Sequence, residues 1–278
     1  MRGHATAVSV VIVVLLLVSQ AALAAGPDPI ELHEGDLTIK GMVFRPDGKG
    51  PFPAVVAMHN CAGLVNSSGA LGARYRDWAQ HLVRAGFVVL FPDSYGSRGL
   101  GNQCANRNQT IRADRERVTD ATAARRWLQQ QPEVRADRIS LLGWSNGATS
   151  VLWTVRPHPR RDDRSDFRSA VAFYPACRRL DTTAWSARVP TLILIGALDD
   201  WSSAPECERM VAGARGRSAR ASIVVYPGAL HDFDHPSRPA QVRTGYALSA
   251  DGSGRIHSGT NPGARADAQQ RVAQWLAR

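Results

Sequence analysis

The residues Gly143-Trp144-Ser145-Asn146-Gly147 place one serine between two glycines. A serine hydroxyl is a weak nucleophile near neutral pH. It attacks an acyl carbon only when a histidine accepts its proton and a carboxylate orients that histidine. The pattern G-x-S-x-G supplies such a nucleophile when it lies on a sharp turn between a strand and a helix. Five residues of this kind also occur by chance, so the neighbouring segments decide their interpretation.

Those neighbouring segments favour a strand-turn-helix arrangement. Residues 138–145, "RISLLGWS", include a short apolar run typical of a buried strand, and residues 146–155, "NGATSVLWTV", open a helix. The serine would then lie on the turn, where the small glycines let the strand and the helix approach each other. We therefore predict that Ser145 is a catalytic nucleophile.

The acid that would orient the base is expected after a later strand. On sheets that carry this kind of turn, the acid follows the serine in the chain and the histidine follows the acid. Asp199 and Asp200 come directly after the apolar run "TLILIG". We assign the role to Asp199 because it is the first acidic residue after the strand. Asp200 stays open as the alternative, and either residue could instead cap the helix that is predicted from Pro205.

The histidine and the oxyanion hole follow from the same reasoning. His231 stands just past the apolar run "SIVVYPGAL", whereas His235 and His257 fall in an irregular stretch. His231 is therefore the predicted base. Backbone N–H groups must also face the negative charge that develops on the substrate oxygen. We expect one from Asn146, and the other from Asn60 or Cys61 after the strand "AVVAMH".

Strands and helices are predicted to alternate along most of the chain. This order is typical of an α/β fold with a mostly parallel central sheet and helices on both faces. Residues 235–262, rich in glycine, serine and proline, are expected to form a long excursion before the last helix. Helices are predicted over residues 70–84, 110–130, 146–155, 205–214 and 264–277, and strands within 37–46, 53–60, 86–92, 138–145, 169–175, 189–197 and 221–229.

The amino terminus resembles an export signal. Arg2 and His4 precede an apolar run over residues 5–18, and the small residues that follow fit a cleavage site after Ala24. The apolar run is shorter than the ~20 residues that a membrane span needs. We expect residues 1–24 to be a signal peptide. Residues 25–278 should form a single exported domain, periplasmic or secreted, without a membrane span.

The net charge of +10 comes almost entirely from arginine. These arginines are scattered along the chain, which favours a solvated surface over a nucleic-acid site. The chain contains neither H-E-x-x-H nor G-x-x-x-x-G-K-[ST], and no cluster of carboxylates. We expect no metal, no cofactor and no nucleic-acid partner, and leave the oligomeric state open.

The segments "HNCAGL", "PDSYGSRG", "GWSNGA", "IGALDD" and "YPGALHDF" together resemble the dienelactone hydrolase family of α/β-hydrolases, from about residue 41 to the last helix. The resemblance implies a triad of Ser145, Asp199 and His231. The family's best-known members carry cysteine at the nucleophile position, where this chain has serine. The implied activity is therefore a more general serine esterase or lactonase acting on a small molecule through an acyl-enzyme.

The resemblance also suggests roles for residues near the predicted site. Four cysteines allow three disulfide pairings; with the loops placed as in this family, Cys61 is expected to pair with Cys104, and Cys177 with Cys207. Tyr95, Arg98 and Trp144 are candidate substrate contacts. The competing hypotheses are a polyester or cutinase-like hydrolase, a peptidase or acyltransferase on the same fold, and an inactive binding module.

Overall fold

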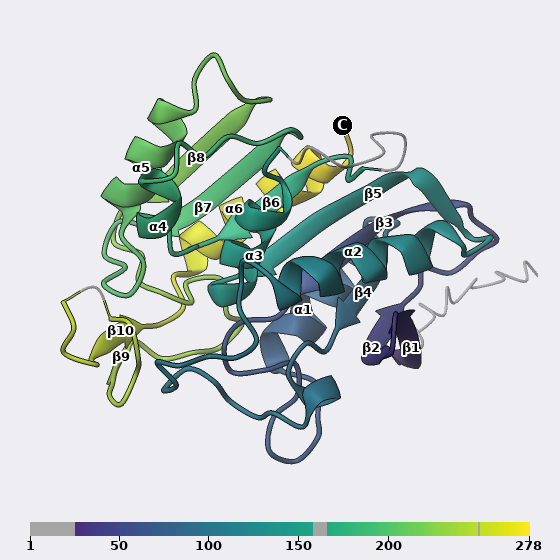
Figure 1. Cartoon of the computed structure of the whole chain (residues 1–278), viewed down its shortest axis with the longest axis horizontal. Helices are drawn as coiled ribbons and strands as arrows, with labels where there is room; N and C mark the ends of the chain where they lie inside the picture. The colour runs from purple at the N-terminus through teal and green to yellow at the C-terminus, as the bar shows by residue number, and fades with distance from the viewer. Residues whose placement is uncertain (1–25, 158–165, 250) are drawn as a thin grey trace, which may run out of the picture.

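A central sheet runs through the protein (Figure 1), and it contains eight strands. The structure, a computed structural model, describes residues 26–157, 166–249 and 251–278. The strand order is β1-β2-β4-β3-β5-β6-β7-β8; the pairs β1–β2 and β2–β4 are antiparallel, and the six strands from β3 to β8 run parallel. The strands are β1 Asp28–Glu34, β2 Leu37–Phe44, β3 Phe52–Met58, β4 Val88–Pro92, β5 Val134–Trp144, β6 Ala170–Phe173, β7 Thr191–Gly196 and β8 Ala221–Tyr226.

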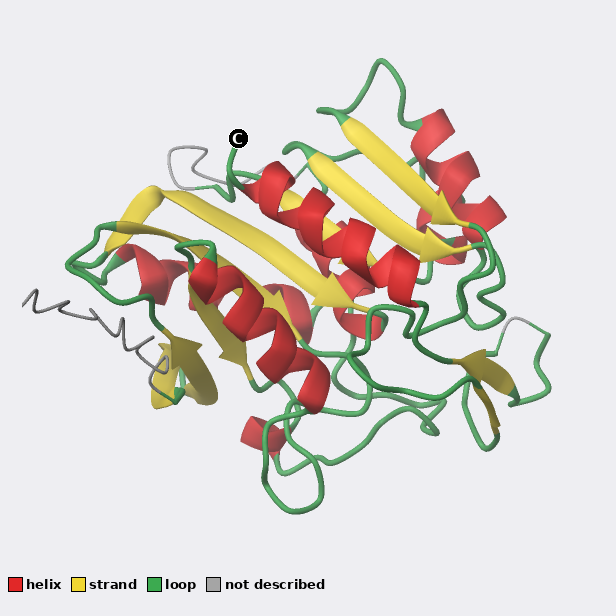
Figure 2. Cartoon of the chain, turned by 180° about the vertical axis from the view of Figure 1, so that it is seen from behind, coloured by secondary structure: helices red, strands yellow, loops and turns green. Residues whose placement is uncertain are grey.

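Helices cover both faces of this sheet. Helices α2 and α3 lie on the face seen in Figure 1, and α1 and α6 lie on the face seen in Figure 2. The connections between consecutive parallel strands therefore cross one face of the sheet or the other, as is usual for parallel strands. The helices are α1 Ala73–Arg84, α2 Glu116–Gln129, α3 Asn146–Thr154, α4 Arg178–Asp181, α5 Ala204–Gly213 and α6 Pro262–Leu276, with a short 3₁₀ turn, η1, at Gly96–Arg98.

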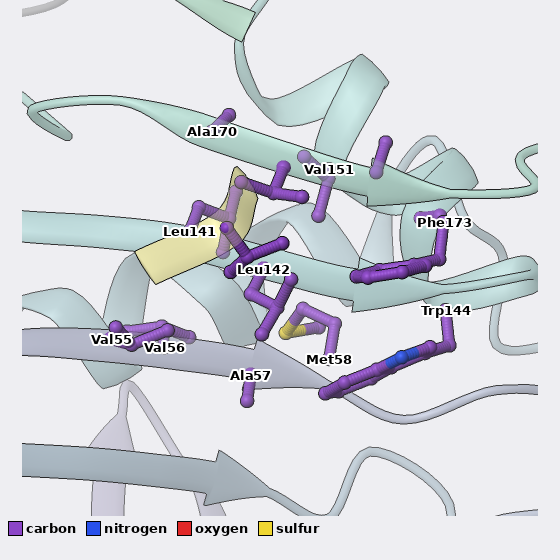
Figure 3. Close-up of a cluster of buried hydrophobic side chains, with 14 of the residues drawn as sticks. Val55, Val56, Ala57, Met58, Leu141, Leu142, Trp144, Val151, Ala170 and Phe173 are labelled. Atoms are coloured by element: carbon purple, nitrogen blue, oxygen red, sulfur yellow. The ribbon is translucent and has the colours of Figure 1, made fainter. Parts of the chain in front are cut away.

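The core lies on both sides of the central strands. Every residue of β4, β6 and β7 is buried, because parallel strands covered by helices have no solvent-facing side. Figure 3 shows part of this core, in which the rings of Trp144 and Phe173 stack near the ends of β5 and β6 with centroids 6.0 Å apart. The predicted α/β class, with a mostly parallel sheet and helices on both faces, is confirmed.

Several elements differ from the prediction. Helix α2 begins at Glu116 rather than near residue 110. A turn precedes it, in which the Glu116 carboxylate accepts the backbone N–H of Arg112 at 2.8 Å and the N–H of Arg117 donates to the Arg112 carbonyl. Strand β1 and helix α4 were not predicted. The excursion expected over residues 235–262 contains a small antiparallel sheet of β9 (Gln241–Arg243) and β10 (Ile256–Ser258).

Two disulfides connect loops at the carboxyl ends of the parallel strands. They join Cys61 to Cys104 and Cys177 to Cys207, which are the pairs expected from the sequence. The expected signal peptide, residues 1–24, lies outside the described residues. In the part of the chain that the structure describes, no helix has the length and apolar character that crossing a membrane requires.

Candidate active site

Ser145 occupies a strained turn between β5 and α3. Its backbone has a φ of 51°, a left-handed value that side chains rarely adopt. The two flanking glycines make this turn possible. A Cβ on Gly147 would lie 2.2 Å from the Met58 carbonyl oxygen, and a Cβ on Gly143 would lie 2.6 Å from the Gly147 carbonyl oxygen. The sequence pattern therefore reflects close backbone contacts that only glycine allows.

The structure brings Ser145, His231 and Asp199 into one hydrogen-bonded row. The Oγ of Ser145 lies 3.2 Å from Nε2 of His231, and Nδ1 of His231 lies 2.7 Å from Oδ2 of Asp199. The histidine is fully buried, with the rings of Trp201 and Tyr174 beside it. This is the order and geometry in which a carboxylate orients an imidazole that takes a proton from serine.

The neighbouring carboxylates Asp199 and Asp200 have separate partners. Oδ1 of Asp199 accepts hydrogen bonds from the backbone N–H groups of Trp201 and Ser202, at 3.0 and 2.8 Å, and its Oδ2 faces His231. Asp200 turns outward and pairs with His257, whose Nδ1 lies 2.7 Å from its Oδ2. Asp199, assigned as the acid, and Asp200, kept as the alternative, therefore face different histidines.

One of the two oxyanion-hole alternatives is excluded by its own hydrogen bond. The backbone N–H of Asn60 donates to the hydroxyl of Tyr75 at 2.9 Å, so it does not face the cleft. Cys61 and Asn146 both line the cleft beside Ser145. Asn146 is also the first residue of α3, where backbone N–H groups lack partners within the helix. The pair of donors that the geometry supports is Cys61 and Asn146.

A cleft of about 930 Å³ opens above Ser145. Trp153 of α3, Trp201 and Leu248 contribute its large apolar side chains, and Leu248 is 63% exposed. Two arginines at the cleft are each paired with a carboxylate: Arg178 lies 2.9 Å from Glu206, and Arg179 lies 3.0 Å from Asp114. The cleft thus combines this apolar surface with a lining that also includes Arg107, Arg112 and Asp251.

The three predicted substrate contacts were wrong, since none of them lines this cleft. Arg98 is bound to Asp120 through two hydrogen bonds, at 2.7 and 3.0 Å. Tyr95 is fully buried, and its hydroxyl donates to the side chain of Asn146. Trp144 is fully buried in the aromatic core. Successive side chains of a strand point to opposite faces, so the residue directly before a cleft-facing serine is expected to turn inward.

A buried carboxylate that sequence reasoning missed connects the histidine loop to the serine turn. Asp234 accepts hydrogen bonds from Nε1 of Trp144 at 2.8 Å, from Nε1 of Trp78 at 2.7 Å and from the hydroxyl of Tyr174 at 2.6 Å. Trp144 immediately precedes Ser145, and Asp234 lies three residues after His231. This carboxylate therefore holds the turn of Ser145 and the loop of His231 at a fixed separation.

Asp232 also holds the loop that follows His231. It is buried at a φ of 65° and forms ion pairs with Arg74 and Arg238. Burial alone would raise the pKa of this carboxyl, but the two guanidinium groups hold it well below its usual range. A charged Asp232 keeps the loop after His231 folded against α1. The repeated acid in "HDFD" was the one sequence signal for this network.

The strand order, the strained serine turn and the Ser–His–Asp row define an α/β-hydrolase. Within the described ranges, no group of three histidine, cysteine, aspartate or glutamate side chains is placed to hold a metal ion. The chain belongs to the dienelactone hydrolase family, whose model matches residues 39–278. It is thus a hydrolase of the dienelactone hydrolase and esterase group.

Several known proteins are similar to this chain. A Bradyrhizobium protein described as a probable 2-oxo-3-(5-oxofuran-2-ylidene)propanoate lactonase is 26% identical over 211 residues, which are 70% of this chain and 79% of that protein. Among solved structures, a dienelactone hydrolase from Anabaena variabilis shares the fold with a TM-score of 0.61 and 17% identity, covering 91% of this chain and 98% of its own. An esterase from Thermogutta terrifontis, solved phosphoramylated by tabun, has a TM-score of 0.61 and 16% identity, covering 91% and 94%.

Proposed function

We propose that this protein is an exported serine hydrolase that cleaves a carboxylic ester or lactone through an acyl-enzyme on Ser145. The observation that carries the proposal is the row from Ser145 through His231 to Asp199, with contacts of 3.2 and 2.7 Å. Membership of the dienelactone hydrolase family supports the reaction class. Two disulfides support export, because such bonds persist in oxidising compartments.

The reaction proceeds in two proton-coupled steps. His231 accepts the proton of Ser145 while Oγ attacks the carbonyl carbon, and the backbone N–H groups of Cys61 and Asn146 stabilise the resulting oxyanion. His231 then gives that proton to the leaving alkoxide as the carbon–oxygen bond breaks. Water, deprotonated by the same histidine, hydrolyses the acyl-enzyme and restores the serine.

The cleft indicates which substrates are accommodated. Leu248 is held at a φ of 63°, an unfavourable conformation for leucine, and its side chain is mostly exposed at the cleft. The adjacent Ala247 fixes this position, because its N–H donates to the Cys104 carbonyl and its carbonyl accepts from Nε1 of Trp201. We propose that Leu248 and Trp201 contact an apolar substituent of the ester.

Chemical labelling tests the nucleophile directly. A fluorophosphonate reacts fastest with an activated serine, by forming an Oγ–phosphorus bond and releasing fluoride. We expect one adduct per folded chain, located at Ser145 by peptide mass spectrometry, and loss of ester hydrolysis in proportion to labelling. Heat-unfolded protein is the control and should stay unlabelled. The absence of an adduct on folded protein, or an adduct at another serine, would refute the proposed nucleophile.

The pH dependence tests the base. Burial on its own would lower the pKa of His231, but the adjacent Asp199 carboxylate outweighs it and leaves the pKa raised above its usual ~6.5. The neutral imidazole is the form that accepts a proton. We therefore expect kcat/KM to fall with unit slope as the pH drops through this raised pKa. The measurement is hydrolysis of an activated ester from pH 5 to 9, with circular dichroism confirming the fold. A rate that stays constant down to pH 5 would exclude His231 as the base.

A further inference from the structure

The side chain of Arg117 occupies an unusual position behind the serine. It is fully buried, and among the described residues no carboxylate lies within 4.0 Å of its guanidinium group. Burying a cation without a close anion costs several kcal/mol. Arg117 is also the second residue of α2, where the helix dipole disfavours positive charge. Because this placement is costly, the hydrogen bonds of Arg117 are informative.

Arg117 binds both halves of the candidate oxyanion hole. One of its terminal nitrogens donates to Oδ1 of Asn146 at 2.6 Å, and the other donates to the carbonyl oxygen of His59 at 2.5 Å. Asn146 carries one of the oxyanion-hole N–H groups, and His59 begins the loop that carries the other, on Cys61. A single planar group thus joins two segments that are far apart in the sequence.

Neighbouring groups hold the Arg117 guanidinium and the Asn146 side chain in place. The guanidinium carbon lies 5.1 Å from the centre of the Tyr95 ring, and the Tyr95 hydroxyl donates to the same Oδ1 of Asn146. The amide nitrogen of Asn146 donates to Gln109 at 3.1 Å, which fixes the orientation of the amide. Tyr95 thus has a structural explanation in place of the expected contact with substrate.

The His59 side chain completes the arrangement. Its Nδ1 lies 2.8 Å from the Asn60 carbonyl oxygen, and its Nε2 accepts the backbone N–H of Ser94. Burial, followed by the charge of Arg117, lowers the pKa of His59 well below its usual value, so the ring stays neutral. A neutral ring that accepts at Nε2 donates at Nδ1. This bond polarises the peptide whose N–H belongs to Cys61.

We infer that Arg117 is a positioning residue of the oxyanion hole. It sets the distance between the Cys61 and Asn146 donors and places a buried positive charge behind the developing oxyanion. In a water-poor site, such fixed charges and dipoles act more strongly than in solvent. This inference rests on the proposed serine hydrolase function, and it adds a specific residue to the stabilisation of the transition state.

The test compares Arg117→Met and Arg117→Lys with the wild type on one activated ester. Because the oxyanion forms only in the transition state, we expect Arg117→Met to lower kcat by roughly 10²-fold, with KM within about twofold of the wild-type value. Arg117→Lys, which keeps the charge but loses the two-pronged contact, should lie between the two. The affinity for an alkyl trifluoromethyl ketone, which forms an oxyanion on Ser145, should fall in parallel with kcat.

Arg125→Met is the matched control. Arg125 is a buried arginine on the same helix, with its guanidinium 3.3 Å from Asp166 and over the Phe167 ring. This variant should lower the melting temperature without changing kcat. Asn146→Ala removes the side chain that Arg117 binds. The loss of kcat in this variant should therefore not add to the loss in Arg117→Met. If Arg117→Met is too unstable to purify, Arg117→Lys and Asn146→Ala provide the same comparison.

Two outcomes would overturn the inference. In one, the folded Arg117 variants have kcat and ketone affinity within about twofold of wild type. In the other, KM rises at constant kcat, which would assign Arg117 to substrate binding in the ground state. Failure of the proposed function is a distinct result, because the wild-type protein would then neither hydrolyse esters nor react with a fluorophosphonate.

Discussion

Replacing Ser145 by alanine is expected to lower kcat/KM for activated esters by about 10⁴- to 10⁶-fold, the loss seen when a hydrolase is deprived of its nucleophile. The remaining oxyanion hole and cleft would support only slow attack by water. The backbone of residue 145 has a positive φ, and alanine tolerates this conformation no worse than serine does. The loss should therefore arise from chemistry and not from unfolding.

Ser140, a buried serine within β5, provides the control. The buried Oγ of Ser140 lies 3.0 Å from Oγ of Ser169, and Ser140 does not line the cleft. Ser140→Ala should cost about 1 kcal/mol of stability and leave kcat/KM unchanged. Melting temperatures of both variants and steady-state rates on the same ester give the comparison. If Ser145→Ala keeps more than about a tenth of the activity, Ser145 is not the nucleophile.

The fold was predictable because its pattern is local. Apolar runs bounded by turn residues mark buried strands, and their alternation with amphipathic segments leaves a parallel sheet as the packing solution. The triad candidates also followed from local pattern, since each stands just past the end of its strand. The β9–β10 pair was not predictable in this way; its strands have three residues each and their pairing depends on the folded context.

The supporting charges could not be predicted, for a different reason. Asp234 binds Trp144 across 90 residues of sequence, and Arg117 binds the His59 carbonyl across 58. Neither pairing has a local signature, because each depends on which elements the sheet brings together. A buried arginine without a neighbouring carboxylate also looks, in the sequence, like any helical surface residue. The residues of the proposed triad could therefore be selected from the sequence, whereas the residues that hold them in place required the structure.

Asp234 and Arg117 support different parts of one site. The carboxylate lies behind the proposed nucleophile and base and holds their loops together through Trp144, Trp78 and Tyr174. The Arg117 guanidinium lies behind the proposed oxyanion donors and fixes the separation between them. Both groups are completely buried, so each keeps a constant set of partners while substrates enter and leave the open cleft. Preorganised electrostatic catalysis requires site residues that buried groups hold in fixed positions in this way.

The neighbouring residues Asp199 and Asp200 offer a paired test of the acid. In Asp199→Asn, the amide oxygen can still accept the N–H groups of Trp201 and Ser202, which turns the amide NH₂ toward His231. Nδ1 must then accept a hydrogen bond, so the proton moves to Nε2. Nε2 is the atom that has to take the proton of Ser145. We expect kcat/KM to fall by about 10⁴-fold through this wrong tautomer.

Asp200→Asn should change kcat/KM by less than about threefold. Its partner is His257, and both side chains are about half exposed, so the pair is worth no more than ~1 kcal/mol. The asparagine oxygen can also keep the hydrogen bond from the His257 backbone N–H. The two variants change neighbouring positions and remove the same charge. A difference in their activities therefore cannot come from net charge, and it would reflect the contact of Asp199 with His231. Steady-state kinetics at a pH where the imidazole is neutral, with melting curves for both, provides the measurement. A larger loss in Asp200→Asn than in Asp199→Asn would transfer the role of the acid to Asp200, and equal losses would show that neither carboxylate orients the base alone.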